Sequence, residues 1–152
     1  MSRNSQPSNG LRPLAVVKAK ATAPENRSRL RLLGCAGDET RLPVNWSGDI
    51  VVARRQGWLL AFQSGFSMTD ATLIATVVSE LARCILCERH GEIALRALAA
   101  SNRCGVEVSA RACACVKVPG PLLGAIGRAV DACEVSFRPG HQTAIRVEKW
   151  RP

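Results

Sequence analysis

Aromatic side chains are scarce in this sequence of 152 residues, which has no tyrosine and only three phenylalanines and three tryptophans. Proteins that hold single-stranded nucleic acid usually stack the bases on interleaved aromatic rings, so this class is disfavoured. Apolar runs are also short, because none approaches the roughly 18 to 20 residues that span a bilayer. The opening MSRNSQPSNG lacks the apolar core of a signal peptide. We therefore expect a soluble cytoplasmic protein.

Seven cysteines are an odd number for a disulfide framework, and we expect no export signal on this chain. Disulfides belong mainly to exported proteins, so we expect these thiols to be reduced. Hydrophobic residues make up 47% of the sequence and charged residues 22%, close to the globular average, which excludes a fully disordered or fibrous chain. The length suits one domain with one core.

The net charge of +9 is spread over the chain, with a local basic concentration from Arg3 to Arg31 where only Glu25 opposes it. Such a run could contact nucleic acid or acidic partners, but a solvated tail is the favoured interpretation. Residues 1–38 are also rich in Ser, Pro, Asn, Ala and Arg and show no sustained periodicity. We predict a disordered basic N-terminal extension over 1–38 and a single domain over 39–152.

Helical periodicity dominates the first half of the predicted domain. Residues 40–44, TRLPV, precede it and predict an edge strand, because proline cannot donate to a ladder. Apolar residues then recur at helical spacing from Asp49, the expected N-cap, to Gly65, which ends the run. Ser67 and Asp70 form a capping-box pattern that opens a second helix, with one broad apolar face, reaching about residue 88.

The second half changes to a period of two residues. Alternation over 92–98 and 105–118 predicts an antiparallel hairpin around the turn-like SNRCG. A short helix over 122–133 and a second hairpin from 133–137 and 143–150 complete the pattern. The order strand, helix, helix, two strands, helix, two strands predicts an α+β fold. We expect a two-layer α/β sandwich with the helices on one face of a mostly antiparallel sheet.

Three motifs stand in the helical half: D-I-x-x-A-R-x-x-G from Asp49 to Gly57, G-F at residues 65 and 66, and I-A-T-x-x-S-E-L-A-R from Ile74 to Arg83. Residues 128–150 add a helix end and a hairpin with a Lys-Trp pair. These segments resemble the stressosome switch kinases, a branch of the anti-sigma factor serine kinases with the histidine kinase-like (GHKL) ATPase fold.

The resemblance implies a nucleotide site whose residues are largely changed here. The family's second helix carries a glutamate expected to act as general base, matched by Glu80, and four residues later an asparagine that ligates Mg²⁺, where this chain has Cys84. A neutral thiol is a poor ligand for Mg²⁺. Ala112 stands at the family's adenine-reading aspartate, while Gly140 and Thr143 match its closing Gly-x-x-Thr.

The family's glycine-rich ATP lid is also missing, since Val118 leads through Pro119 directly towards the last helix. Phosphoryl transfer depends mainly on metal and positioning, so losing the metal ligand, the adenine contact and the lid should abolish it. We therefore predict a pseudokinase, a truncated histidine kinase-like ATPase domain that binds neither ATP nor Mg²⁺ as a cofactor.

For function, the resemblance implies a regulatory protein-binding module of a bacterial partner-switching system in stress signalling. The implied partner is a STAS-domain antagonist, a PP2C-type phosphatase or a sigma factor, and the expected contact residues are Asp49, Arg54 and Arg55. We expect neither a membrane nor a nucleic acid as partner.

Two alternatives remain open at this stage. One is an active ATP-dependent serine/threonine protein kinase that uses Glu80. The other is a metal or redox protein, in which the thiols of the two halves converge across the former nucleotide site: Cys84, Cys87, Cys113 and Cys115. His90 and His141 lie in turn-like segments, where we expect exposed side chains and can name no partner.

Overall fold

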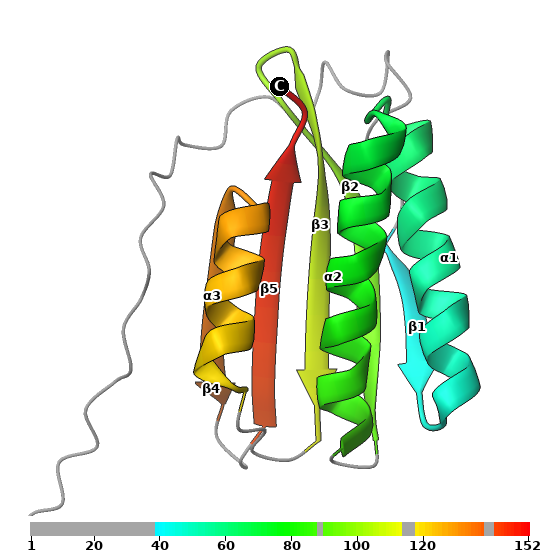
Figure 1. The fold of residues 1–152 in the computed structure, drawn as a ribbon, viewed down its shortest axis with the longest axis vertical. Coiled ribbons are helices and arrows are strands. Elements are labelled where there is room, and N and C mark those ends of the chain that lie inside the picture. The colour runs from blue at the N-terminus through cyan, green and yellow to red at the C-terminus, as the bar shows by residue number, and fades with distance from the viewer. Residues whose placement is uncertain (1–38, 88–89, 114–117, 139–141) are drawn as a thin grey trace, which may run out of the picture.

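The computed structural model describes residues 39–87, 90–113, 118–138 and 142–152 (Figure 1). The predicted extension over 1–38 lies outside these ranges and stays a prediction. The elements follow the order expected from the sequence: β1 (Thr40–Val44), α1 (Ser47–Gln63), α2 (Met68–Cys87), β2 (Gly91–Ala100), β3 (Arg103–Ala112), α3 (Gly120–Ala129), β4 (Ala132–Arg138) and β5 (Gln142–Trp150).

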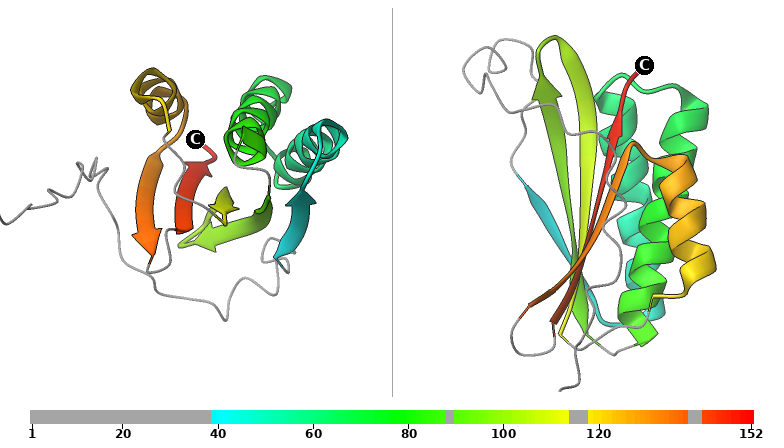
Figure 2. Two further views of the ribbon diagram at one scale, coloured as in Figure 1. Left: turned by 90° about the horizontal axis from the view of Figure 1, so that it is seen from below. Right: turned by 90° about the vertical axis from the view of Figure 1, so that its left-hand side faces the viewer.

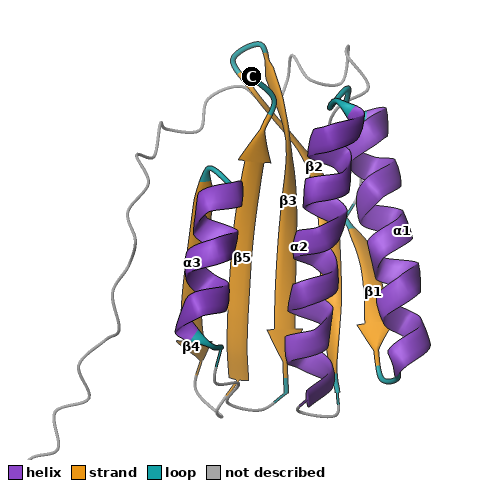
Figure 3. Cartoon of the chain, viewed as in Figure 1, coloured by secondary structure: helices purple, strands orange, loops and turns teal. Residues whose placement is uncertain are grey.

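One five-stranded sheet forms the second layer, in the strand order β1-β2-β3-β5-β4 with every neighbouring pair antiparallel. The three helices lie together on one side of this sheet (Figures 2 and 3). The prediction of an α+β two-layer fold is thereby confirmed. Strand β1 lies at an edge and contains Pro43, as predicted.

The core lies between the helices and the sheet. Side chains that alternate along β2 and β3 face the helices, among them Ile93 and Val108, and the broad apolar face of α2 meets them with Val78 and Leu81. All four are at most 2% exposed. The period-two strands and the 3.6-period helix therefore bury the faces that their patterns predict. None of the helices in the described ranges has the length and apolarity needed to cross a membrane.

Helix α1 begins before Asp49, so the prediction that Asp49 is the N-cap is wrong. The N-cap is Trp46, and Asp49 occupies the third helical position. Its carboxylate accepts hydrogen bonds from the backbone N–H groups of Asn45 (2.8 Å) and Trp46 (3.2 Å). An acidic side chain can satisfy these donors by reaching back from inside the first turn, as in a capping box, which explains the shift.

The last helix and the first hairpin also differ in their bounds. Helix α3 begins at Gly120 rather than residue 122, because Pro121 suits a first turn, and it ends at Ala129 where Val130 turns extended. The turn of the β2–β3 hairpin consists of Ser101 and Asn102 alone, both with positive φ, so Arg103 already belongs to β3. Of the strand predicted over 105–118, the structure describes β3 to residue 112, and residues 114–117 lie outside the described ranges.

The sheet face opposite the helices is lined by charged side chains. Glu107, only 5% exposed, accepts from Arg96 at 2.8 Å and from Arg146 at 2.6 Å, and Arg146 also pairs with Glu148 at 2.7 Å. Within the described residues no further layer covers this face (Figure 2). On this face, paired guanidinium and carboxylate groups cover the strands where an apolar layer would otherwise pack.

Candidate functional site

Glu80, the predicted general base, lies on α2 and forms an ion pair with Arg83, one turn further along the same helix. Its side chain is about one third exposed. A carboxylate held by a neighbouring guanidinium at the helix surface is an ordinary stabilising pair. The local geometry gives Glu80 no partner to activate.

Cys84, which replaces the expected metal ligand, is half-buried and packs against the core cluster. Burial raises the pKa of its thiol above the usual value of 9.0, and the nearby Cys87 and Glu80 raise it further. The group therefore stays a neutral thiol at physiological pH, and a neutral thiol does not replace an oxygen ligand for Mg²⁺.

Two other positions that match the nucleotide site, Ala112 and Thr143, are buried and border a hollow at the end of the sheet. Ala112 at the end of β3 pairs in register with Thr143 at the start of β5, and both are nearly fully buried. A Cβ placed on Gly91 of β2 would collide with the side chain of Ile85 and with the backbone of β3, so α2 sits tightly on this end of the sheet. Gly140 lies outside the described residues. The described positions are filled by small side chains that face the core.

The predicted convergence of thiols is not found where the structure can test it. Cys84 and Cys87 are close on α2, whereas Cys113 lines a hollow on the opposite face of the sheet. Cys115 lies outside the described ranges. Cys84, Cys87 and Cys113 are free thiols, and the described residues form no group of three or more candidate ligands able to hold a metal ion.

No protein-family model and no curated protein matches this chain. The resemblance to the switch kinases therefore stays a prediction, and the site has to be argued from the geometry of the molecule itself.

Helix α1 has an unusual distribution of side chains. Its buried residues are the small Ala53, Gly57 and Ala61, whereas Val51 is 68% and Phe62 is 51% exposed. Among the described residues, six large hydrophobic side chains are exposed, and five of them lie on α1, at its N-cap or at the first residue of α2: Trp46, Val51, Val52, Phe62 and Met68. We call this surface the α1 face.

The predicted contact residues lie on or beside the α1 face. Arg55 is exposed, and Arg54, also exposed, donates to Ser79 Oγ of α2 at 3.4 Å. Asp49 is engaged by backbone donors at the start of the helix. The ring of Phe62 stacks on that of Trp58, with centroids 5.0 Å apart, which adds a rigid aromatic pair. The result is a basic surface with apolar anchors.

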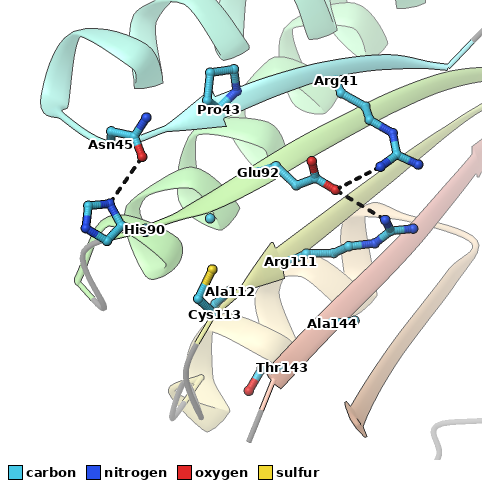
Figure 4. Close-up of a pocket in the computed structure, with 11 residues that line it drawn as sticks. Arg41, Pro43, Asn45, His90, Glu92, Arg111, Ala112, Cys113, Thr143 and Ala144 are labelled. Carbon is cyan, nitrogen blue, oxygen red and sulfur yellow. Dashed lines mark hydrogen bonds and ion pairs between the residues drawn. The ribbon is translucent and has the colours of Figure 1, made fainter. Parts of the chain in front are cut away.

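A hollow of about 540 Å³ opens at one end of the sheet, on the face away from the helices (Figure 4). Glu92 accepts there from Arg41 at 3.4 Å and from Arg111 at 3.2 Å. His90 Nδ1 lies 3.3 Å from Asn45 Oδ1, so the expectation that no partner could be named for His90 is corrected. The alternation of the strands could have predicted this grouping. His90 and Glu92 stand two residues apart, as do Arg111 and Cys113, so each pair lies on one face of the sheet.

Proposed function

We propose that this chain is a regulatory protein-binding module that holds its partner on the α1 face. The observation that carries the proposal is the exposure of large apolar side chains along α1, at Val51, Val52 and Phe62. Other apolar residues of the helix, among them Ile50 and Leu60, pack against the core. Contiguous exposed apolar patches on soluble proteins mark interaction sites.

The charges of the α1 face define the partner's chemistry. Arg55 is exposed on the same helix as Val51 and Val52, and Arg54 is exposed but donates through Nη1 to Ser79 Oγ of α2. Self-association through this face would bring like charges together, so an apolar surface rimmed by carboxylates is the complementary partner. The family resemblance supports the same location and names the partner classes: a STAS-domain antagonist, a PP2C-type phosphatase or a sigma factor in a partner-switching system.

Reversing the charge of Arg55 tests this surface most directly, because its exposed side chain can change without loss of packing. The partner is first captured from the native host, purified and recombined with the chain, and its Kd is measured by calorimetry. We expect the double variant Arg54→Glu/Arg55→Glu to weaken binding by more than about 1 kcal/mol and Arg55→Glu alone to account for part of it. The melting temperature should stay nearly unchanged for Arg55→Glu.

The matched control is Arg128→Glu, which reverses an exposed arginine on α3. It changes the net charge by the same amount as Arg55→Glu but lies on another helix. Unaltered binding by the double α1 variant, or equal weakening by Arg128→Glu, would show that the α1 face is not the contact.

Nucleotide binding provides a second test, because the proposed module works without ATP. We expect Mg-ATP to leave the melting temperature unchanged in a thermal-shift assay, since Cys84 and Ala112 replace the family's contact residues and are packed against the core. A ligand at 100 times its Kd stabilises a protein by about 2.7 kcal/mol, so binding would be visible. A saturable rise would instead favour the kinase alternative, and loss of labelled-phosphate transfer in Glu80→Gln would then establish it.

A further inference from the structure

Three polar side chains form a row across the ends of three neighbouring strands, at the edge of the hollow in Figure 4. Asn45 follows β1, His90 precedes β2 and Cys113 follows β3. The ladders pair Val44 with Gly91 and Gly91 with Ala112, so the row continues the register of the sheet by one residue. Cys113 N–H donates to the carbonyl oxygen of His90 at 3.3 Å, which fixes these two residues opposite each other.

Opposed residues of antiparallel strands bring their Cβ atoms to about 5 Å, within reach of a thiol and an imidazole. His90 is oriented from its other side, because its Nδ1 lies 3.3 Å from Asn45 Oδ1. Because an amide oxygen only accepts, a hydrogen bond at this contact requires the hydrogen on Nδ1, and Nε2 is then the ring nitrogen that can act as the base. The ring of His90 contacts Asn45, and its contact with Cys113 is through the backbone. Hydrogen bonds between a base and a nucleophile often tighten only when the ligand binds. A thiol, a base opposite it and a group that orients the base are the parts that activate a thiol.

We propose that Cys113, assisted by His90 and Asn45, is a reactive thiol site that forms mixed disulfides with small carboxylate-bearing disulfides. This inference is independent of the α1 face, which lies on the helical side of the molecule. His90 acts as the base and Asn45 is a positioning residue that keeps its ring in the productive tautomer. Cys113 is exposed, so a small molecule can reach it.

The hollow supplies the preference for carboxylates. Arg111 stands two residues before Cys113 on the same face of the sheet. It donates a hydrogen bond to Glu92 through Nη1. A guanidinium carries five N–H donors in a fork that suits a carboxylate, so donors of Arg111 remain for a ligand. Arg41 approaches the same Glu92 carboxylate from β1. A ligand carboxylate would lie over these two guanidinium groups while its sulfur meets Cys113.

The exchange step balances without further reactants. The Cys113 thiol gives its proton to His90 Nε2, and Sγ attacks one sulfur of the ligand disulfide. The S–S bond of the ligand breaks, a Cys113–S–S–R bond forms, and the thiolate R–S⁻ leaves and takes up the proton. The protein thiol is oxidised and one half of the ligand is reduced.

Cys87 provides a matched control within the same chain, because it is also an exposed free thiol but lies on α2. The full-length protein in a Cys115→Ala background is exposed briefly to dithiobis(nitrobenzoate), and peptide mass spectrometry follows both cysteines. We expect Cys113 to react about tenfold faster than Cys87. His90→Gln should bring Cys113 down to the rate of Cys87, Asn45→Ala should lower it in part, and both should leave Cys87 unchanged.

A neutral disulfide, dithiodipyridine, separates the two parts of the proposal. Arg111→Gln should slow the reaction of Cys113 with the carboxylated reagent and leave its reaction with the neutral one unchanged. Equal slowing of both reagents would refute the carboxylate preference. Equal rates for Cys113 and Cys87, or a His90→Gln variant in which Cys113 reacts as before, would refute the thiol site itself.

Discussion

Replacing Gly57 with valine is expected to lower the free energy of unfolding by about 3 kcal/mol, because α1 and α2 meet at this residue without room for a side chain. A Cβ at position 57 would lie 2.8 Å from Cγ2 of Val78. Val78 is fully buried and β-branched, so its single favoured rotamer in a helix leaves it no way to withdraw. The helices would have to separate, and the α1 face would lose its support.

Urea unfolding of four variants checks this expectation: Gly57→Val, Val78→Ala, their double variant and Gly127→Val. Gly127→Val on α3 is the control, because a Cβ at Gly127 meets nothing within 4 Å and valine is no worse than glycine in a helix. Its stability should therefore stay close to that of the parent chain. Adding Val78→Ala to Gly57→Val should recover part of the loss, and a fully additive double variant would show that the two residues do not compete for the same space.

Glu107→Gln is expected to cost about 2 kcal/mol of stability, because it removes the one carboxylate that holds Arg96 and Arg146 together. The Glu107 side chain is only 6% exposed, so its loss leaves two guanidinium groups facing each other over a buried amide. The full penalty for breaking a buried pair would be larger. Arg96 is 38% exposed and Arg146 is 48% exposed, so water screens both charges and lowers the loss of stability.

The sheet contains its own control for this change. Glu92 also bridges two arginines, Arg41 and Arg111, but its side chain is 31% exposed. We expect Glu92→Gln to cost less than about 1 kcal/mol, since exposed pairs contribute little. Chemical denaturation of both variants at low and high salt measures the difference. Equal losses at the two positions would mean that burial does not set the strength of these pairs.

Local patterns were sufficient for most elements of the fold. Ser67 and Asp70 interact at the start of α2 as their spacing predicted, with Ser67 Oγ accepting from Asp70 N at 3.1 Å and donating to the Asp70 carboxylate at 2.7 Å. Such signals rest on neighbours three or four residues apart, so the sequence contains all of the interacting groups. The alternation of β2 and β3 identified their buried faces for the same reason.

The candidate sites depend on contacts that no local pattern contains. Apolar residues stand on more than one side of α1, so helical spacing alone could not decide that Ala53 and Ala61 face inward while Phe62 faces outward. That choice follows from the close approach of α2. The row of Asn45, His90 and Cys113 likewise exists only because β2 lies between β1 and β3, which brings together residues that are far apart in the sequence. Asn45 and His90 stood outside the predicted strands and Cys113 stood inside one, so no local pattern indicated that the three residues would meet.

The ion pairs on the charged sheet face make the residues at positions 107, 146 and 148 depend on one another. Glu107 and Glu148 stand directly opposite each other in the β3–β5 ladder, an arrangement that two carboxylates alone would disfavour. Arg146 offsets the repulsion between the two carboxylates, because it donates to Glu107 through Nε and to Glu148 through Nη2. Lysine offers one compact ammonium group instead of this planar fork and could not serve both acids in the same way. Among homologous chains, the residues at 107, 146 and 148 should therefore change together, and an arginine lost at 146 should be accompanied by the loss of one acid.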